Sequence, residues 1–306
     1  MRLTLLFCVL LSCIAGTIRA QQSPDTTFAL DIEQPAHARG TGPVIAIDGG
    51  HGNFHQVDNR FSPFARVLRE DGYRVTGHSG PFLAKALDKY DVLVIANPLH
   101  PDNQGNWQLP TPSAFTIEEI VVVRDWVAAG GSLFLIADHM PFPGAARDLG
   151  RAFGFELTNG FAMDNRRRTR ERFLRRRGTL HPNVITNGSD GLSPVDSVIS
   201  FTGSAFYAPP EAVPILSFDE HYTNTMPEIA WQFGDNTPFH SAEDMLQGAY
   251  RTFGKGRVVV FGEAAMFTAQ TSGPNFKVGI NLPEAKSNIQ LLRNIMQWLV
   301  EIRNQK

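Results

Sequence analysis

The chain has 306 residues, and its 28 lysines and arginines against 30 aspartates and glutamates give a formal net charge of −2. Such a balance gives no indication of nucleic-acid or membrane binding. The chain contains two cysteines, Cys8 and Cys13. Both lie in the first 20 residues, so a chain without that segment has no disulfide bond, no thiolate nucleophile and no cysteine-ligated metal.

The first 20 residues have the features of an export signal. Arg2 gives a short positive start, and Leu3–Leu11 is an apolar run too short to span a bilayer. A small-residue cleavage site ends at Ala20. We therefore expect an exported protein, periplasmic or secreted, with lipid attachment at Cys13 as the weaker alternative. No later stretch is predicted to cross a membrane.

The next segment, residues 21–42, is polar and contains proline, which predicts a flexible leader before the folded domain. From there to about residue 160, apolar strand-like runs alternate with helix-like segments, a pattern typical of an α/β domain with a parallel sheet. Thr116 and Glu119 have the spacing of a capping box. The predicted strands are Pro43–Ile47, Tyr73–Thr76, Val92–Ala96 and Ser132–Ala137, and the predicted helices begin near Ser62, Thr116 and Gly144.

Beyond about residue 160 the pattern changes to strands without intervening helices, at Val198–Phe201, Val213–Phe218 and Glu228–Phe233. Tyr250–Phe253 and Arg257–Phe261 flank two glycines, which predicts a hairpin. A last helix is expected to begin near Ser287, with a second capping-box spacing. We thus predict one α/β domain over residues 43–306, with a β-rich insertion around 160–250.

Polar side chains follow three predicted strands at the point where each strand ends. Because the carboxyl ends of parallel strands share one edge of a sheet, we expect these side chains to line a common crevice. They are Asp48 and His51, then Asp138 and His139, then Glu263.

Carboxylate and imidazole together suit zinc, manganese or iron. We therefore hypothesise a divalent metal that polarises a carbonyl or activates water, with His55 or Glu263 as the general base. One alternative is that the same residues have a structural role only, as hydrogen-bonded parts of turns. Another is an acid–base site without a metal. The four expected ligands are Asp48, His51, Asp138 and His139.

Three further residues near these strand ends are candidates for substrate binding. Asn53 and Arg60 follow the first strand, and His100 follows Val92–Ala96. A histidine in a surface loop is the commoner outcome for a residue placed like His100. The motifs of serine hydrolases, P-loop nucleotide-binding proteins and dinucleotide-binding proteins are absent, as is His-Glu-x-x-His.

An arginine-rich segment, Arg166–Arg177, holds eight arginines and one acidic residue, Glu171. A solvated charge run is the default interpretation. A clamp for carboxylate or phosphate groups is the next, because guanidinium binds such anions bidentately. Nucleic-acid binding is not expected, because no aromatic platform accompanies the run.

Five stretches of the chain resemble the class I glutamine amidotransferase-like superfamily. They are VIAIDGGHGN, YDVLVIANPLH, WVAAGGSLFLIADHMPFPGA, GKGRVVVFGEAAMF and NIQLLRNIMQWL, which span most of residues 43–301. More narrowly, the chain resembles the exported branch near the trehalose-utilisation (ThuA-like) and gliding-motility-type domains. The resemblance implies a flavodoxin-like, doubly wound sheet with helices on both faces.

True amidotransferases carry a cysteine on a strand-to-helix turn, and the matching turn here holds Asp138 and His139. Glutamine hydrolysis through a thioester is therefore excluded. We expect a hydrolase acting on carbohydrate or cell-envelope material, with a small-molecule or glycan ligand. The alternative is a non-catalytic binding or scaffold domain that retains the fold.

Overall fold

The computed structural model describes residues 22–166, 170–188, 192–273 and 276–301. The expected signal peptide, with both cysteines, lies outside the described residues. Among the helices of the described part, none has the length and apolar character that crossing a membrane requires.

The core of the fold is a sheet whose parallel half has the strand order β3-β2-β4-β5-β15. Numbered along the chain, this is the flavodoxin-like order 2-1-3-4-5. The predicted α/β class with a mostly parallel, doubly wound sheet is thereby confirmed. The strands are β2 (Val44–Asp48), β3 (Arg74–His78), β4 (Val92–Ala96), β5 (Ser132–Ile136) and β15 (Gly256–Phe261).

Antiparallel strands extend the same sheet beyond β15. The predicted hairpin is confirmed, because β14 pairs antiparallel with β15 across a turn at Gly254 and Lys255. Gly254 has a φ of +58° and lies against the end of α3, which favours glycine there. The added strands are β14 (Leu246–Phe253), β10 (Phe206–Tyr207), β6 (Glu156–Leu157) and β11 (Val213–Ser217).

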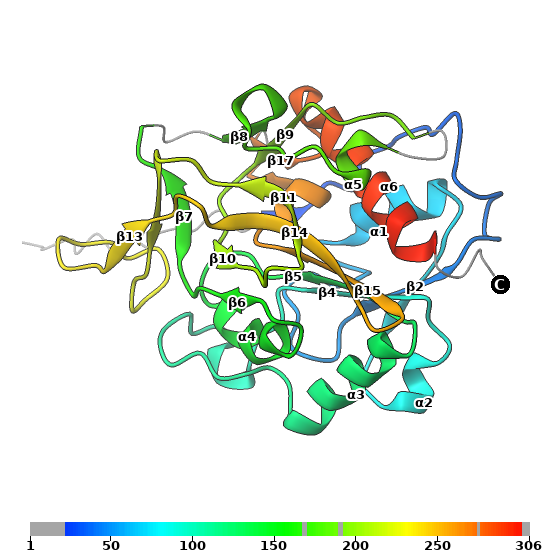
Figure 1. Cartoon of the computed structure of the whole chain (residues 1–306), viewed down its shortest axis with the longest axis horizontal. Coiled ribbons are helices and arrows are strands. Elements are labelled where there is room, and N and C mark those ends of the chain that lie inside the picture. Colours follow the sequence, from blue (N-terminus) through cyan, green and yellow to red (C-terminus); the bar gives the residue numbers. More distant parts are fainter. Residues whose placement is uncertain (1–21, 167–169, 189–191, 274–275, 302–306) are drawn as a thin grey trace, which may run out of the picture.

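Helices cover both faces of the sheet, with α1, α5 and α6 on one side and α2, α3 and α4 on the other (Figure 1). Successive strand residues point to opposite faces. Val92 and Val94 accordingly join the core under α1 and α6, while Leu93 and Ile95 join the core under α2–α4. The helices are α1 (Ser62–Glu70), α2 (Ala84–Leu87), α3 (Ile117–Ala128), α4 (Phe142–Ala152), α5 (Val184–Asn187) and α6 (Lys286–Val300).

The predicted helix starts are confirmed to different degrees. Thr116 and Glu119 form the expected capping box at the start of α3. The second capping box is wrong, because α6 begins at Lys286 and has no side-chain cap. Its N-terminus instead continues from the preceding 3-10 turn η4, Pro283–Ala285. Helix α4 begins two residues before Gly144, at Phe142.

The β-rich part of the chain forms two small sheets beside the central one. The run Glu228–Phe233, predicted as a strand, is instead irregular, with one isolated bridge from Ile229 to Gln108. Trp231 has a φ of +67°, which a strand does not allow, and its ring packs on Phe161. The small sheets comprise β7 (Phe161–Asp164), β12 (Tyr222–Thr225) and β13 (Phe239–Ser241), and β8 (Glu171–Leu174) with β9 (Ser197–Ser200).

The described part of the leader is attached to the domain, which differs from the expectation of a flexible segment. Strand β1 (Gln22–Pro24) pairs with β16 (Ala269–Ser272), which in turn pairs with β17 (Phe276–Gly279). Phe28 is buried in the core, so one apolar side chain and one strand edge anchor a polar segment. Three further 3-10 turns are η1 (Pro101–Asn103), η2 (Arg175–Arg177) and η3 (Ala265–Phe267).

Candidate functional site

A cleft of about 830 Å³ lies at the carboxyl ends of the parallel strands. Its walls come from the loops after β2, β4 and β5 and from Trp231. Strands β2 and β4 are neighbours at the point where the strand order reverses, and α/β sheets bind ligands at such a point. A second hollow of about 970 Å³, between residues 25–34 and 277–293, contains none of the predicted site residues.

Asn97, directly after β4, connects the loops around the cleft. Its φ of +50° is the left-handed conformation, which asparagine tolerates better than most residues. Its side-chain Oδ1 accepts the backbone N–H of Asp138 (2.8 Å), and its Nδ2 lies 3.0 Å from Nδ1 of His55. Its backbone carbonyl accepts the N–H of Phe54 (2.8 Å). One residue thus ties together the ends of β2, β4 and β5.

This network fixes the protonation state of His55. Because Oδ1 of Asn97 accepts from the backbone, its Nδ2 faces His55 and can only donate, so Nδ1 of His55 accepts. The proton of the neutral ring is therefore on Nε2. His55 is 2% exposed, and its Nε2 has no hydrogen-bond partner among the described residues.

Burial, followed by the charges of Arg60 and His139, lowers the pKa of His55 to about 3. His55 therefore stays neutral through the physiological pH range. The sequence predicted a general base here, but the hydrogen bonds to Asn97 make Nε2 a donor. This arrangement suits polarisation of a ligand oxygen rather than acceptance of a proton.

His139 has the opposite tautomer to His55, with the proton on Nδ1 instead of Nε2. Its Nδ1 lies 2.8 Å from the carbonyl oxygen of Met140, which can only accept, so Nδ1 donates and Nε2 is the free acceptor. The ring stacks on Phe161 (4.6 Å between centroids, 9° between planes) and meets the edge of Trp231 (4.6 Å). His139 lines the cleft, so it is the imidazole placed to take a proton there.

Asp138 and Glu263 follow the neighbouring strands β5 and β15, as predicted. Asp138 lines the cleft, is 7% exposed and accepts the backbone N–H of His139 (2.8 Å). Burial raises its pKa, although the charge of His139 and hydrogen bonds to the carboxylate oppose the shift. The protonated form of Asp138 is therefore favoured relative to an exposed aspartate.

Glu263 does not line the cleft and is fully buried. Its two carboxylate oxygens accept the N–H groups of Ala265 (2.7 Å) and Met266 (2.8 Å), so the side chain caps the turn η3. Burial, with the charge of Asp138 next in size, raises its pKa well above the usual range. These contacts place Glu263 behind the cleft wall, where a general base has no access to a substrate.

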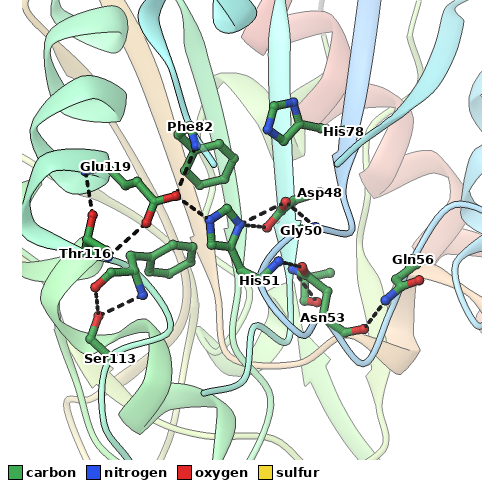
Figure 2. A network of polar contacts seen from close by, with 12 residues as sticks. Asp48, Gly50, His51, Asn53, Gln56, His78, Phe82, Ser113, Thr116 and Glu119 are labelled. Carbon is green, nitrogen blue, oxygen red and sulfur yellow. Dashed lines mark hydrogen bonds and ion pairs between the residues drawn. The ribbon is translucent and has the colours of Figure 1, made fainter. Parts of the chain in front are cut away.

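Asp48 and His51 form a second polar cluster together with Glu119 (Figure 2). Nδ1 of His51 lies 2.9 Å from one carboxylate oxygen of Asp48, and its Nε2 lies 2.9 Å from Glu119. Both ring nitrogens face carboxylates, which accept and do not donate, so both donate and the ring is an imidazolium. Burial lowers the pKa of His51, but the hydrogen bonds and charges of the two carboxylates outweigh it and raise the pKa.

Glu119 connects this cluster to helix α3. One of its carboxylate oxygens accepts both the His51 ring and the N–H of Phe82 (3.1 Å), while the other accepts the N–H of Thr116 (3.0 Å). The imidazolium packs between Phe82 and Phe115 (centroids 4.2 and 4.8 Å away). A buried ion cluster therefore holds the loop after β2 to the start of α3.

The four expected metal ligands lie in these two separate groups rather than around one point. Strand β4 separates the ends of β2 and β5, and the imidazolium of His51 lies between its two carboxylates, with both nitrogens occupied. Among the described residues, three potential ligand atoms come within 4.8 Å of one another only at Asp219, Glu220 and His221, on a turn remote from the predicted set in sequence. The residues present at the cleft do not fit a shared metal centre.

The residues expected to bind substrate have different positions. Asn53 lines the cleft, and its Oδ1 accepts the backbone N–H of His51 (3.0 Å). Arg60 also lines the cleft, with its guanidinium 3.8 Å from the centre of the Phe54 ring. His100 does not line the cleft, because its Nδ1 accepts the N–H of Asp102 (3.2 Å) and caps the turn η1.

In the arginine-rich segment, three of the six described arginines have an acidic partner, while Arg172, Arg176 and Arg177 have no ion pair among the described residues. Arg166 pairs with Asp164 (2.9 Å), Arg170 with Glu284 and Arg175 with Asp196 (3.0 Å). Residues 167–169 lie outside the described part. The clamp for anionic ligands that the composition suggested therefore remains an expectation for the exposed remainder of this segment.

Sequence reasoning missed four residues of these two clusters, namely Asn97, Trp107, Glu119 and Trp231. Asn97 had a usable signal, since it directly follows a predicted buried strand. Glu119 was assigned only to the capping box, because its partner His51 is distant in sequence. Nothing in the local pattern around Trp107 or Trp231 indicated a cleft wall.

No family model matches the chain, and no curated protein matches it. Among solved structures, the N-terminal domain of mmIFT52 has a similar fold, with a TM-score of 0.59 and 12% identity over 84% of this chain and 97% of that chain. A protein named as ThuA-like from Bacteroides uniformis matches with a TM-score of 0.46 and 12% identity, over 89% and 94%. A protein named as a GMP synthase component from Thermoplasma acidophilum matches with a TM-score of 0.46 and 12% identity, over 86% and 96%. At such identities the likeness concerns the fold alone.

Proposed function

We propose that the protein is an exported hydrolase of the glutamine amidotransferase-like superfamily that acts on carbohydrate or related cell-envelope material. In this proposal the chemistry is general acid–base catalysis by the chain's own residues, without a metal. The observation that carries it concerns His55, in the wall of the cleft: its Nε2–H is buried and has no hydrogen-bond partner among the described residues.

A buried donor without a partner costs about 1–3 kcal/mol, which a ligand oxygen would recover. Because the Asn97 amide holds His55 neutral, the donor is in place before any ligand arrives. A neutral imidazole donor can polarise a carbonyl and stabilise the negative charge that develops on its oxygen. His55 is therefore assigned as the electrophilic residue.

His139 and Asp138 supply the proton transfers in this proposal. Nε2 of His139 accepts a proton from water, while the Met140 carbonyl holds the ring in the required tautomer. Asp138 lies beside it with a raised pKa, which suits a group that donates a proton to a leaving oxygen. The two roles use neighbouring residues at the end of one strand.

The walls of the cleft support an oxygen-rich, ring-shaped ligand. The walls combine aromatic rings with amide side chains, a composition that offers apolar faces and hydrogen bonds to the same small molecule. The aromatic residues are Phe54, Trp107, Phe142 and Trp231, and the amides are Asn53, Asn59, Asn97 and Gln104.

The second candidate function is non-catalytic binding of the same ligands. The aromatic walls favour binding as much as they favour catalysis, because aromatic rings can hold a ligand but cannot transfer its protons. Turnover separates the two candidates.

Two substitutions of His55 test the assignment with acetylated sugars as substrates, because their ester bond contains the carbonyl that His55 would polarise. His55→Asn keeps an acceptor for Asn97 but removes the Nε2–H, whereas His55→Gln keeps a donor near the position of Nε2. We expect His55→Asn to lower kcat by about 10²–10³ and His55→Gln to retain more activity. Turnover should survive EDTA, and loss of activity with the chelator would contradict metal-free chemistry. Binding without turnover would support the second candidate, and the absence of both would contradict the proposal.

A further inference from the structure

Arg60 is a cation in the cleft wall that has no acidic partner within the described part of the chain. Among the described residues, no carboxylate lies within ion-pair distance of its guanidinium, whereas nine of the sixteen other described arginines have such a partner. The guanidinium is partly buried, and burial lowers its pKa. A desolvated cation with no counter-ion is costly, so such a group points to a ligand that supplies the charge.

The position of Arg60 is fixed by the protein rather than by solvent. Its Nε donates to the carbonyl oxygen of Gln22 in β1 (3.1 Å), and its Nη1 donates to that of Phe54 (3.5 Å). The guanidinium also lies over the Phe54 ring. Arginine has five N–H donors, so these contacts orient the group and leave donors for a ligand.

Other donors line the same cleft. Oδ1 of Asn59 accepts the N–H of Gln56 (2.7 Å), which leaves its amide nitrogen free to donate. His55 contributes its Nε2–H, and its pKa responds to the charge of Arg60, so the two groups are close. Burial raises the pKa of Asp138, the carboxylate that lines the cleft. The cleft is therefore rich in donors, and Asp138 is the one carboxylate among the residues that line it.

We propose that the ligand of this cleft is a sugar that carries an oxyanion, either a carboxylate or a phosphate, and that Arg60 binds that group with help from Asn59. This inference rests on the proposed function in placing the ligand in the same cleft, but it concerns recognition and not hydrolysis. The planar guanidinium fork matches both oxyanions, and the two sources are separated by experiment.

The test is calorimetric titration of the purified protein with glucose, glucuronate and glucose 6-phosphate. Arg60→Gln removes the charge and Arg60→Lys keeps the charge without the fork. Arg124→Gln, at an exposed arginine on α3, is the matched control. We expect the wild type to prefer an anionic sugar and Arg60→Gln to weaken its binding about 10- to 100-fold, with Arg60→Lys between them. Binding of glucose should not change.

Thermal unfolding of each variant checks that the protein remains folded when the hydrogen bond from Arg60 to Gln22 is removed. Preference for glucuronate identifies the carboxylate, and preference for glucose 6-phosphate identifies the phosphate. Equal binding of neutral and anionic sugars, equal weakening of both by Arg60→Gln, or no binding of either anion would overturn the inference. Arg60-dependent binding without turnover would uphold this inference while contradicting the proposed hydrolase.

Discussion

The imidazolium of His51, buried between Asp48 and Glu119, offers a direct test of the electrostatics. Two substitutions each remove a different one of its two hydrogen bonds. His51→Asn places an amide nitrogen near the position of Nδ1 and keeps a donor for Asp48. His51→Gln reaches farther, to the position of Nε2, and keeps a donor for Glu119. Each variant removes the positive charge and one of the two hydrogen bonds.

The expected loss is large because the cluster is buried. His51 is 7% exposed, and the removal of one partner from a buried ion pair costs about 3–5 kcal/mol. The neutral amide recovers one hydrogen bond, worth about 0.5–1.5 kcal/mol. We therefore expect each variant to lose about 2–4 kcal/mol of unfolding free energy, a sizeable share of the 5–15 kcal/mol typical of proteins.

The loss should depend on pH in a defined direction. Folding raises the pKa of His51 above its ordinary value of about 6.5, so the imidazolium contributes its full stability below about pH 6.5. That contribution fades as the pH rises through the pKa of the folded state. Neither amide titrates, so the difference between wild type and variant should be largest near about pH 6 and smaller near about pH 9.

Urea unfolding followed by tryptophan fluorescence, at several pH values in this range, measures the difference. Equal slopes of free energy against urea would show that the variants unfold from comparable states. A loss that is the same at every pH would refute the imidazolium, because it would mean that the ring is neutral. A loss below about 1 kcal/mol would refute the buried ion cluster itself.

Two further predictions concern the segments that hold this cluster. Gly50→Ala should lower the free energy of unfolding by about 1–3 kcal/mol, because a Cβ would lie 2.5 Å from the carbonyl oxygen of Gly80 and the backbone must shift. Gly234→Ala, with open space around it, is the control. Equal thermal stability of the two variants would contradict the close approach at Gly50. Thr116→Ala should lose about 1 kcal/mol by removing the cap on the Glu119 N–H, and chemical denaturation that shows no change would mean that the capping box contributes nothing.

The sequence by itself determined the five parallel strands and their order along the chain, but not all the strands of the β-rich part. Continuous apolar runs such as Val92–Ala96 can be buried on both faces, which is what a parallel strand requires, and Gly254 with Lys255 specifies a hairpin. The polar residues at the strand ends followed from the same pattern. These features are local, because hydrophobic periodicity and turn chemistry act over a few residues.

The tertiary structure alone decided what those polar residues are. His51 and His55 lie four residues apart in one loop, yet one is a buried cation and the other a neutral donor. Their partners, Glu119 and Asn97, come from distant parts of the chain and meet them only when the sheet assembles. Protonation depends on burial and on the charges within a few ångströms, and no sequence pattern records those distances.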